Sequence, residues 1–293
     1  MEALGARALL DLERIDDGRF RSVRNLDNGR RAIFGGQPIA QGLAAARRTV
    51  PGWPAHNVTG QYLRAGLPEV PVDYRVEAVR DGRRYASRRV LATQDGKPIF
   101  DMLCAFHDAE DGPHHQFAER PPSPPPESLE STASFVRRNA HRLPPGMVEI
   151  YTLPFPVELR PIDPEAVFFQ PLTTPKRDFW LRMPSAVEID DPIDHQALLA
   201  FVSDYWLAGT VGAMHIRPGD SERVATVTLN HSLWFHAPVR ADAWLLHQTD
   251  SPWAGDGRGL ARGLIYDEAG RLIATTAQEI SIRPMRAETP PVR

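Results

Sequence analysis

The chain has 293 residues, which is long for one domain and ample for two. Hydrophobic residues make up 42% and charged residues 24%, and the formal net charge of -3 provides no strong field that would attract nucleic acid. No segment approaches the roughly 20 apolar residues of a membrane span. A single cysteine, Cys104, excludes an intrachain disulfide and a cysteine-rich zinc site, and with the charged N-terminus it predicts a cytoplasmic protein.

The first predicted helix covers residues 35–50, GGQPIAQGLAAARRTV. Its alanines favour a helix, and the two glycines that open it allow another backbone to approach closely. Residues 62–100 then predict antiparallel strands joined by a tight turn at 94–96, where a glycine supplies a positive φ.

Prolines mark the middle of the chain, at 121–126 and 143–146. Such segments are typical of a connector that lies on the surface. They divide the chain into an N-terminal domain (1–115), a connector (116–154) and a C-terminal domain (155–293).

The second half repeats the pattern of the first. A helix is predicted over 194–210, DHQALLAFVSDYWLAGT, with Asp194 as a candidate N-cap. Strands follow, and superimposing Gly96 on Gly270 also matches Arg88 with Arg262 and Cys104 with Gln278. One helix followed by long antiparallel strands, occurring twice, predicts an α+β fold in which a sheet wraps each helix.

Asp204 is the first candidate for chemistry, because it interrupts an otherwise apolar helix. On a helical wheel it shares a face with small residues, which would let a ligand or another backbone come close to the carboxylate (Ala197, Ala200, Ala208). Burial would raise the pKa of this carboxylate and make it a better base near neutral pH. An exposed aspartate, or one that caps a local turn, is the alternative interpretation.

Two later strands add polar candidates. Strict alternation in 224–238 places Thr228 on one face with Asn230, and His231 on the other. His231 and His236 then point to opposite faces, which argues against a metal site. Gln278 ends an apolar stretch on the last strand, so its burial is possible.

Several segments together resemble the type II acyl-CoA thioesterases, in the right order over nearly the whole chain. They are FGGQPIAQGLAAA (34–46), RDGRRYASRRVLATQDGKPIF (80–100), SDYWL (203–207), NHSLWFHAP (230–238) and ATTAQE (274–279). The resemblance implies a double hot-dog fold, hydrolysis of fatty acyl-CoA without a cofactor, and assembly as a homodimer or homotetramer. In that family an Asp, a Thr and a Gln jointly hold the hydrolytic water, and the matching positions here are Asp204, Thr228 and Gln278.

Two positions depart from the family's pattern. Asn230 stands where the family often has Asp, and Thr59 stands where it often has His in an early strand. Both changes leave the proposed catalytic residues intact and concern substrate preference.

The resemblance leads to a mechanism in which Asp204 takes a proton from water and backbone N–H groups near Gly36 and Gln37 stabilise the oxyanion. Basic residues should meet the phosphates of coenzyme A, and the candidates are Arg83, Arg84, Arg88 and Arg89. A solvated strand edge is the alternative interpretation for these arginines. The first helix offers only Gly and Ala where an Asp would be needed, so one active site per chain is expected.

Two rival functions remain open at the level of sequence. A hot-dog hydratase normally uses an Asp/His pair, and the helix that carries Asp204 has no suitably placed histidine. A protein that binds acyl-CoA without hydrolysing it would share the fold. Release of free thiol from acyl-CoA distinguishes a thioesterase from these two rivals.

Overall fold

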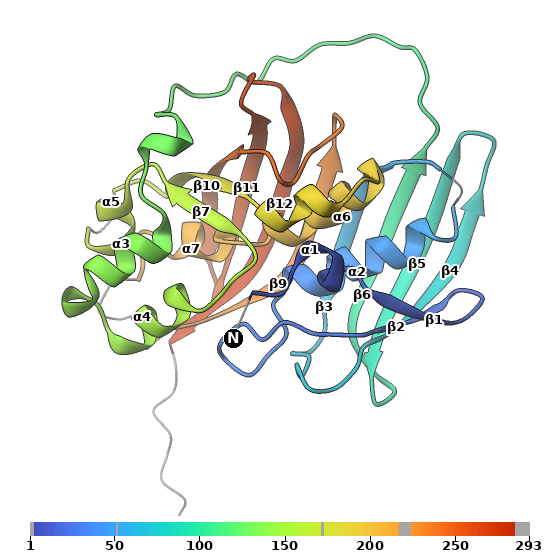
Figure 1. Ribbon diagram of the computed structural model, residues 1–293, viewed down its shortest axis with the longest axis horizontal. Coiled ribbons are helices and arrows are strands. Elements are labelled where there is room, and N and C mark those ends of the chain that lie inside the picture. Colours follow the sequence, from blue (N-terminus) through green and yellow to red (C-terminus); the bar gives the residue numbers. More distant parts are fainter. Residues whose placement is uncertain (1–2, 51, 171–172, 217–223, 285–293) are drawn as a thin grey trace, which may run out of the picture.

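The computed structural model describes residues 3–50, 52–170, 173–216 and 224–284. Within these ranges, twelve strands form one antiparallel sheet that curves around two helices, α2 (Gly36–Arg47) and α6 (Pro192–Ser203), as Figure 1 shows. This is the α+β arrangement that the sequence predicts, with helix and antiparallel sheet combined. None of the described helices is long and apolar enough to cross a membrane.

The strand order is symmetric about the centre of the sheet. From the centre outward, the N-terminal half runs β3, β6, β5, β4, β2, β1 and the C-terminal half runs β9, β12, β11, β10, β8, β7. The halves join where β3 pairs with β9, with Thr59 opposite Ser232. The strands of the first half are β1 (Leu12–Asp16), β2 (Arg19–Ser22), β3 (Ala55–Tyr62), β4 (Asp73–Asp81), β5 (Tyr85–Gln94) and β6 (Lys97–His107). Those of the second half are β7 (Glu158–Pro161), β8 (Lys176–Arg182), β9 (Val224–Phe235), β10 (Leu245–Gly255), β11 (Arg258–Asp267) and β12 (Leu272–Pro284).

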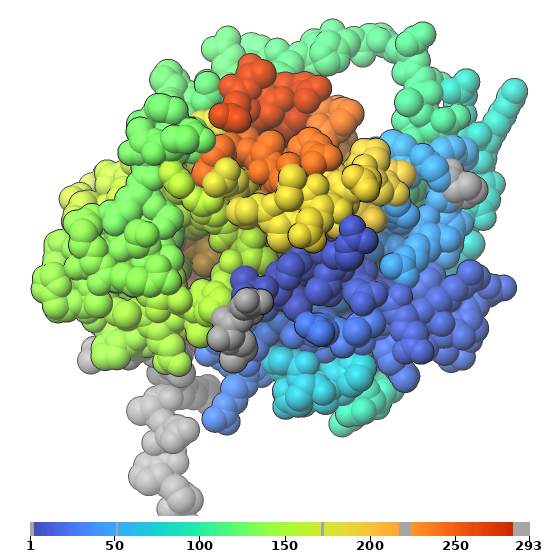
Figure 2. All heavy atoms as spheres, in the orientation of Figure 1, coloured from blue at the N-terminus to red at the C-terminus, as the bar shows by residue number. Residues whose placement is uncertain are grey.

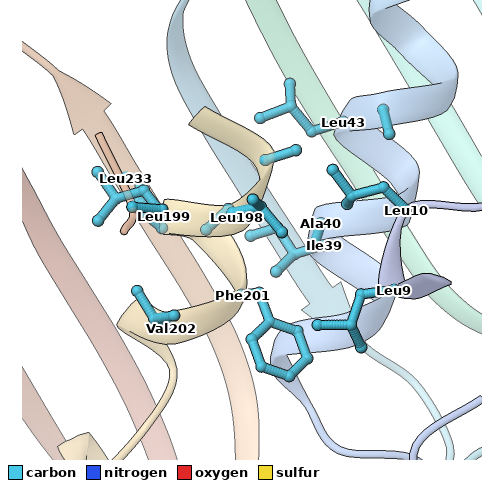
Figure 3. Packing of buried hydrophobic residues seen from close by; sticks show 14 of the residues in the cluster. Leu9, Leu10, Ile39, Ala40, Leu43, Leu198, Leu199, Phe201, Val202 and Leu233 are labelled. Carbon is cyan, nitrogen blue, oxygen red and sulfur yellow. The ribbon is translucent and has the colours of Figure 1, made fainter. Parts of the chain in front are cut away.

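Helices α2 and α6 pack against each other inside the curve of the sheet and form the centre of the core. Figure 3 shows Ile39 and Leu43 of α2 beside Leu198 and Phe201 of α6, and all four are buried. A Cβ atom on Gly36 would clash with the carbonyl oxygen of Phe201. The close approach predicted for the opening glycines is confirmed, since only glycine lets these two backbones touch.

The second predicted helix differs from the one observed. It begins at Pro192, because Asp191 is the N-cap and its side chain accepts a hydrogen bond from the N–H of Ile193 at 2.8 Å. It ends at Ser203, and a separate short helix, α7 (Leu207–Gly212), follows. The break lies at Trp206, whose φ of 68° is left-handed and cannot continue a right-handed helix.

The superposition of Arg88 on Arg262 is wrong by one residue. Arg88 lies opposite Cys104 in the sheet, while Ala261 lies opposite Gln278. Ala261 is therefore the counterpart of Arg88, and both are buried, whereas Arg262 is exposed and pairs with Asp250. The predicted turn between β5 and β6 is confirmed, with φ of 73° at its glycine.

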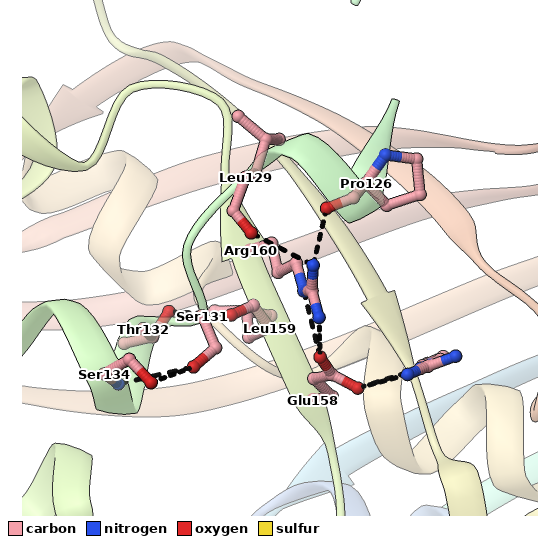
Figure 4. A network of polar contacts seen from close by, with 9 residues as sticks. Pro126, Leu129, Ser131, Thr132, Ser134, Glu158, Leu159 and Arg160 are labelled. Atoms are coloured by element: carbon pink, nitrogen blue, oxygen red, sulfur yellow. Dashed lines mark hydrogen bonds and ion pairs between the residues drawn. The ribbon is translucent and has the colours of Figure 1, made fainter. Parts of the chain in front are cut away.

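The proline-rich connector has two parts with different structure. Residues 108–125 contain no helix or strand, and Figure 2 shows this segment arching away from the body of the molecule. The rest packs on the C-terminal half: in Figure 4, Arg160 of β7 donates to the carbonyl oxygens of Pro126 and Leu129 and pairs with Glu158. The remaining helices are α1 (Ala6–Leu9), α3 (Thr132–Arg138), α4 (Pro145–Thr152), α5 (Pro164–Phe168) and three short 3₁₀ turns (Pro126–Ser128, Ala140–Arg142, Pro184–Glu188).

Gly36→Ala should lower the free energy of unfolding by about 1–3 kcal/mol, because the new methyl group forces α2 away from α6. The measurement is equilibrium unfolding in denaturant. Gly112→Ala is the matched control, since nothing lies within 4 Å of a Cβ at that position. A gain in stability at Gly36, as for an ordinary helical Gly→Ala change, would contradict this account of the helix contact.

Candidate active site

Asp204 lies where the end of α6 meets the start of α2. It is the residue after Ser203, it is 8% exposed, and a Cβ on Gly35 would lie 2.7 Å from its Oδ2 atom. The predicted position within a continuous helix is therefore wrong, because α6 ends here and Ala208 belongs to α7. The predicted approach of another backbone to the carboxylate is confirmed, and the start of α2 supplies it.

Gln278 and Thr228 form a hydrogen-bonded group with Asp204. The Nε2 of Gln278 donates to Oδ1 of Asp204 at 2.9 Å and to Oγ1 of Thr228 at 2.7 Å. Thr228 Oγ1 lies 3.4 Å from the same carboxylate oxygen. Gln278 is fully buried, and among the described residues its Oε1 has no hydrogen-bond partner. The group therefore presents one free acceptor beside a carboxylate.

A β-bulge turns Thr228 toward this group. Glu279 of β12 pairs with Asn230, but Ile280 pairs with Thr228, so Leu229 is an extra residue in β9. Strict alternation predicts that Thr228 shares a face with Asn230; this is wrong, because the bulge reverses the phase of the strand. Asn230 instead points to the outer face and bonds with Glu279.

Burial controls the acidity of Asp204. It raises the pKa of the carboxyl to about 6, while hydrogen bonds from Gln278, Thr228 and the backbone N–H of Gly36 act in the opposite direction. The start of α2 also carries the partial positive charge of a helix N-terminus, which favours the ionised form. Asp204 is therefore charged at neutral pH and has a pKa suited to accepting a proton.

Ser203 and His231 support the end of α6. Ser203 Oγ lies 2.9 Å from Nε2 of His231 and also bonds with the carbonyl of Ala200. Burial lowers the pKa of His231 to about 3, so this imidazole is neutral. Sequence reasoning did not single out Ser203, and its position directly before Asp204 was the only available signal.

An aromatic cluster includes the residues next to Gly35 and Asp204 in the chain. Phe34, directly before Gly35, lies 5.1 Å from Phe155 between ring centroids, and Phe155 lies 5.0 Å from Tyr205. These three rings are only partly buried. Sequence reasoning missed them, since Phe155 is distant in the chain from the motifs. An apolar, partly open surface next to a charged group suits an acyl chain whose thioester reaches Asp204.

The predicted oxyanion residues are both engaged in other bonds. The backbone N–H of Gln37 donates to the carbonyl of Phe34, and its side chain bonds with Arg24 and Leu26. The backbone N–H of Gly36 faces Asp204. Gln37 thus ties the loop before α2 to the helix, and the start of α2 supports the carboxylate.

The four arginines predicted to meet coenzyme A do not gather around Asp204. Arg88 is 4% exposed and bonds with Thr49, just beyond the C-terminal end of α2, whereas Asp204 lies at its start. A helix of this length spans about 18 Å. Arg84 pairs with Glu110 and Arg89 with Asp101 on the surface, and Arg83 is exposed.

The N-terminal half has no equivalent of the polar group. The residue after α2 is Arg48, where α6 is followed by Asp204, and Cys104 occupies the position of Gln278. Burial raises the pKa of the Cys104 thiol to about 12, so it is not a nucleophile. A pocket of about 660 Å³ lies beyond the C-terminal end of α2, and Arg48 and Arg88 form part of its lining.

Comparison with known proteins decides the family. Residues 22–107 match the acyl-CoA thioesterase N-terminal domain, and residues 115–282 match the acyl-CoA thioesterase C-terminal domain. The chain belongs to the acyl-CoA thioesterase family. It is a thioester hydrolase that acts on acyl-CoA, and the resemblance found in the sequence is confirmed.

Relatives match this thioesterase over nearly its whole length. Human acyl-coenzyme A thioesterase 8 is 35% identical over 96% of this chain and 90% of its own. Acyl-CoA thioesterase 2 of Haemophilus influenzae is 33% identical over 94% and 96%. Among solved structures, acyl-CoA thioesterase II TesB2 from Mycobacterium marinum has a TM-score of 0.76 and 31% identity, and covers 97% of this chain and 99% of its own. A hot-dog protein from Alicyclobacillus acidocaldarius, with a TM-score of 0.75 and 20% identity, shows the fold.

The activity of this thioesterase should fall as the pH falls through about 6, because protonation removes the charge of Asp204, which is the base in the mechanism proposed below. The measurement is kcat/KM against pH with an acyl-CoA. An acyl-pantetheine thioester is the control, since it lacks phosphates that also titrate. Full activity persisting well below this pH would mean that the carboxylate of Asp204 is not required.

Proposed function

We propose that fatty acyl-CoA is hydrolysed to free fatty acid and coenzyme A by a water held between Asp204, Thr228 and Gln278. The observation that carries the proposal is the geometry of Gln278. Its Nε2 joins the other two side chains, while its buried Oε1 has no partner among the described residues. A buried acceptor without a donor is costly, and a water between Oε1 and the carboxylate would satisfy it.

The proposed reaction proceeds without a covalent enzyme intermediate. The water donates one hydrogen bond to Asp204 and one to Gln278, and its oxygen attacks the thioester carbonyl carbon as Asp204 takes the proton. The tetrahedral intermediate then collapses, the C–S bond breaks, and the proton passes from Asp204 to the departing sulfur. Thr228 and Gln278 hold the water in place, which lowers the entropic part of the barrier.

For the oxyanion we propose the start of α2, where the helix N-terminus concentrates positive potential. The backbone N–H of Gly36 bonds with Asp204 in the free protein, so in this proposal it shifts to the oxyanion as Asp204 takes the proton and loses its charge. Gln37 has a supporting role, since its own N–H is bonded to Phe34.

We further propose that the chain is a tandem double hot-dog, with domains at 1–115 and 155–293 and the catalytic residues in the second. The symmetric strand order about β3 and β9 supports this interpretation. A cytoplasmic location and a homodimer or homotetramer remain predictions from the sequence.

A hydratase is a weaker alternative. His231 lies opposite Gln278 in the sheet, so a histidine does stand near the group. However, its Nε2 is held by Ser203, and burial lowers its pKa to about 3, so it is a poor proton donor.

Asp204→Asn should reduce kcat by about 10²–10⁴-fold, because it removes the proton acceptor while keeping the shape of the side chain. It should not lower the free energy of unfolding, since the raised pKa shows that burial of this charge costs stability above pH 6. The measurement is thiol release from straight-chain acyl-CoAs, with thermal unfolding alongside.

Asp178→Asn is the matched control, because burial also raises the pKa of this carboxyl, on β8. It should leave turnover near normal. Near-normal turnover in Asp204→Asn would refute the role of base, and full activity of Gln278→Ala would refute the water clamp.

A further inference from the structure

Arg177 is an inward-facing arginine on β8. It lies opposite Thr249 of β10, whose side chain bonds with Thr210 of α7, so Arg177 shares the face that α7 covers. Its guanidinium packs on Gly209 of α7, where a Cβ would lie 2.7 Å from Nη1. The absence of a side chain at Gly209 thus leaves room for the cation.

No acidic side chain compensates this cation among the described residues. The Nε of Arg177 is buried without a hydrogen-bond partner. Burial lowers the pKa of Arg177, and only the phenol of Tyr151 acts against it. By contrast, Arg182 on the same strand points to the other face and pairs with Glu158. A partly buried cation without an anion is destabilising.

Trp206 places a further donor in the same region. Its Nε1–H is buried without a hydrogen bond of good geometry, and it acts as a donor toward the hydroxyl of Tyr151. Its ring lies 5.5 Å from Phe179, two residues along β8 from Arg177, and 6.1 Å from Tyr151 of α4. Its left-handed φ of 68° adds backbone strain at the same place.

Tyr151 contributes a third polar group. Burial raises the pKa of its hydroxyl, and the positive charges of Arg177 and Arg30 partly offset this. Donors from β8, from the α6–α7 turn and from α4 therefore surround one place. Figure 1 shows α3, α4 and α5 grouped beside α7 at this end of the molecule. The guanidinium of Arg177 lacks an acceptor among the described residues, and a bound anion would supply it.

We propose that Arg177, with the hydroxyl of Tyr151 that Trp206 orients, binds an anionic group of the substrate. Trp206 is two residues after Asp204, so the bound group belongs to a molecule that also reaches the catalytic carboxylate; in this respect the proposal rests on the proposed catalytic site. The guanidinium matches an oxyanion through paired N–H donors. An acyl-CoA has two sources of such a group: a phosphate of coenzyme A, or a carboxylate at the far end of the acyl chain.

The test compares Arg177→Gln with the unmodified protein on three thioesters: octanoyl-CoA, the CoA monothioester of octanedioic acid, and octanoyl-pantetheine. If a CoA phosphate binds here, kcat/KM falls about 10- to 100-fold for both CoA thioesters and not for octanoyl-pantetheine. If a terminal carboxylate binds here, it falls by this factor only for the octanedioic thioester. Equal loss on all three substrates, or no loss on any, overturns the proposal.

Lys176→Gln is the matched control, because it removes the same charge from the neighbouring, exposed position on β8 and should change none of the three rates. Arg177→Lys should retain part of the preference. Arg177→Gln should also melt at an unchanged or higher temperature, because it removes an uncompensated cation; a clear drop would show a structural role and overturn the proposal.

The catalytic proposal fails in a different way. If Asp204→Asn keeps its turnover, that proposal is lost, while the comparison of substrates for Arg177 still stands. Gly209→Ala gives an independent check, since the new methyl group must displace the guanidinium and should reproduce the substrate pattern of Arg177→Gln.

Discussion

The contact between the start of α2 and the end of α6 is the constraint on which the rest of the structure depends. Two glycines without side chains bring the backbone of α2 against the carbonyl of Phe201 and the carboxylate of Asp204. The contact buries the carboxylate, raises its pKa and provides a helix N-terminus beside it. The contact that packs the two helices is therefore also the contact that buries the proposed catalytic base.

The opposite ends of the two helices meet differently. There Arg47 forms ion pairs with Asp191 and Asp194, so the charges compensate each other. Beyond α2, Arg88 donates to Thr49 and Asp81, whereas its counterpart Ala261 packs against Leu207 and Val211 of α7. At one end of the helix pair the charges are paired, while the other end keeps a carboxylate and an amide oxygen available. The symmetry of the strands is thus not matched by symmetry of the chemistry.

The same half holds the other unsatisfied polar groups of the α6–α7 region. Arg177 resembles Gln278, since each has a buried polar atom without a partner in the described structure. A buried polar atom without a partner lowers the free energy of unfolding by about 1–3 kcal/mol, so folding alone does not favour it. In the two proposals, the catalytic water and an anionic group of the substrate supply the partners that Gln278 and Arg177 lack.

Several features follow from the sequence by itself. The alanines and glycines of 35–50 determine a helix that permits close approach, and Asp204 is visible as a charge in an apolar segment. The turn at Gly96 and the repeated order of helix and strands are also local patterns. The family and its hydrolytic activity were evident because the motifs occur together and in order.

Tertiary structure decided the rest. The bulge at Leu229 arises from the pairing of β9 with β12, so alternation alone assigned Thr228 to the wrong face. The left-handed Trp206 ends α6 because its ring packs against Phe179 and Tyr151, which lie far away in the chain. Arg88 and Arg177 are both arginines on strands, yet the charge of Arg88 is paired with Asp81, whereas that of Arg177 has no acidic partner among the described residues. The face of a strand residue, the end of a helix and the pairing of a charge depend on which distant segments come together. Periodicity along the chain reports only the local conformational preferences of adjacent residues.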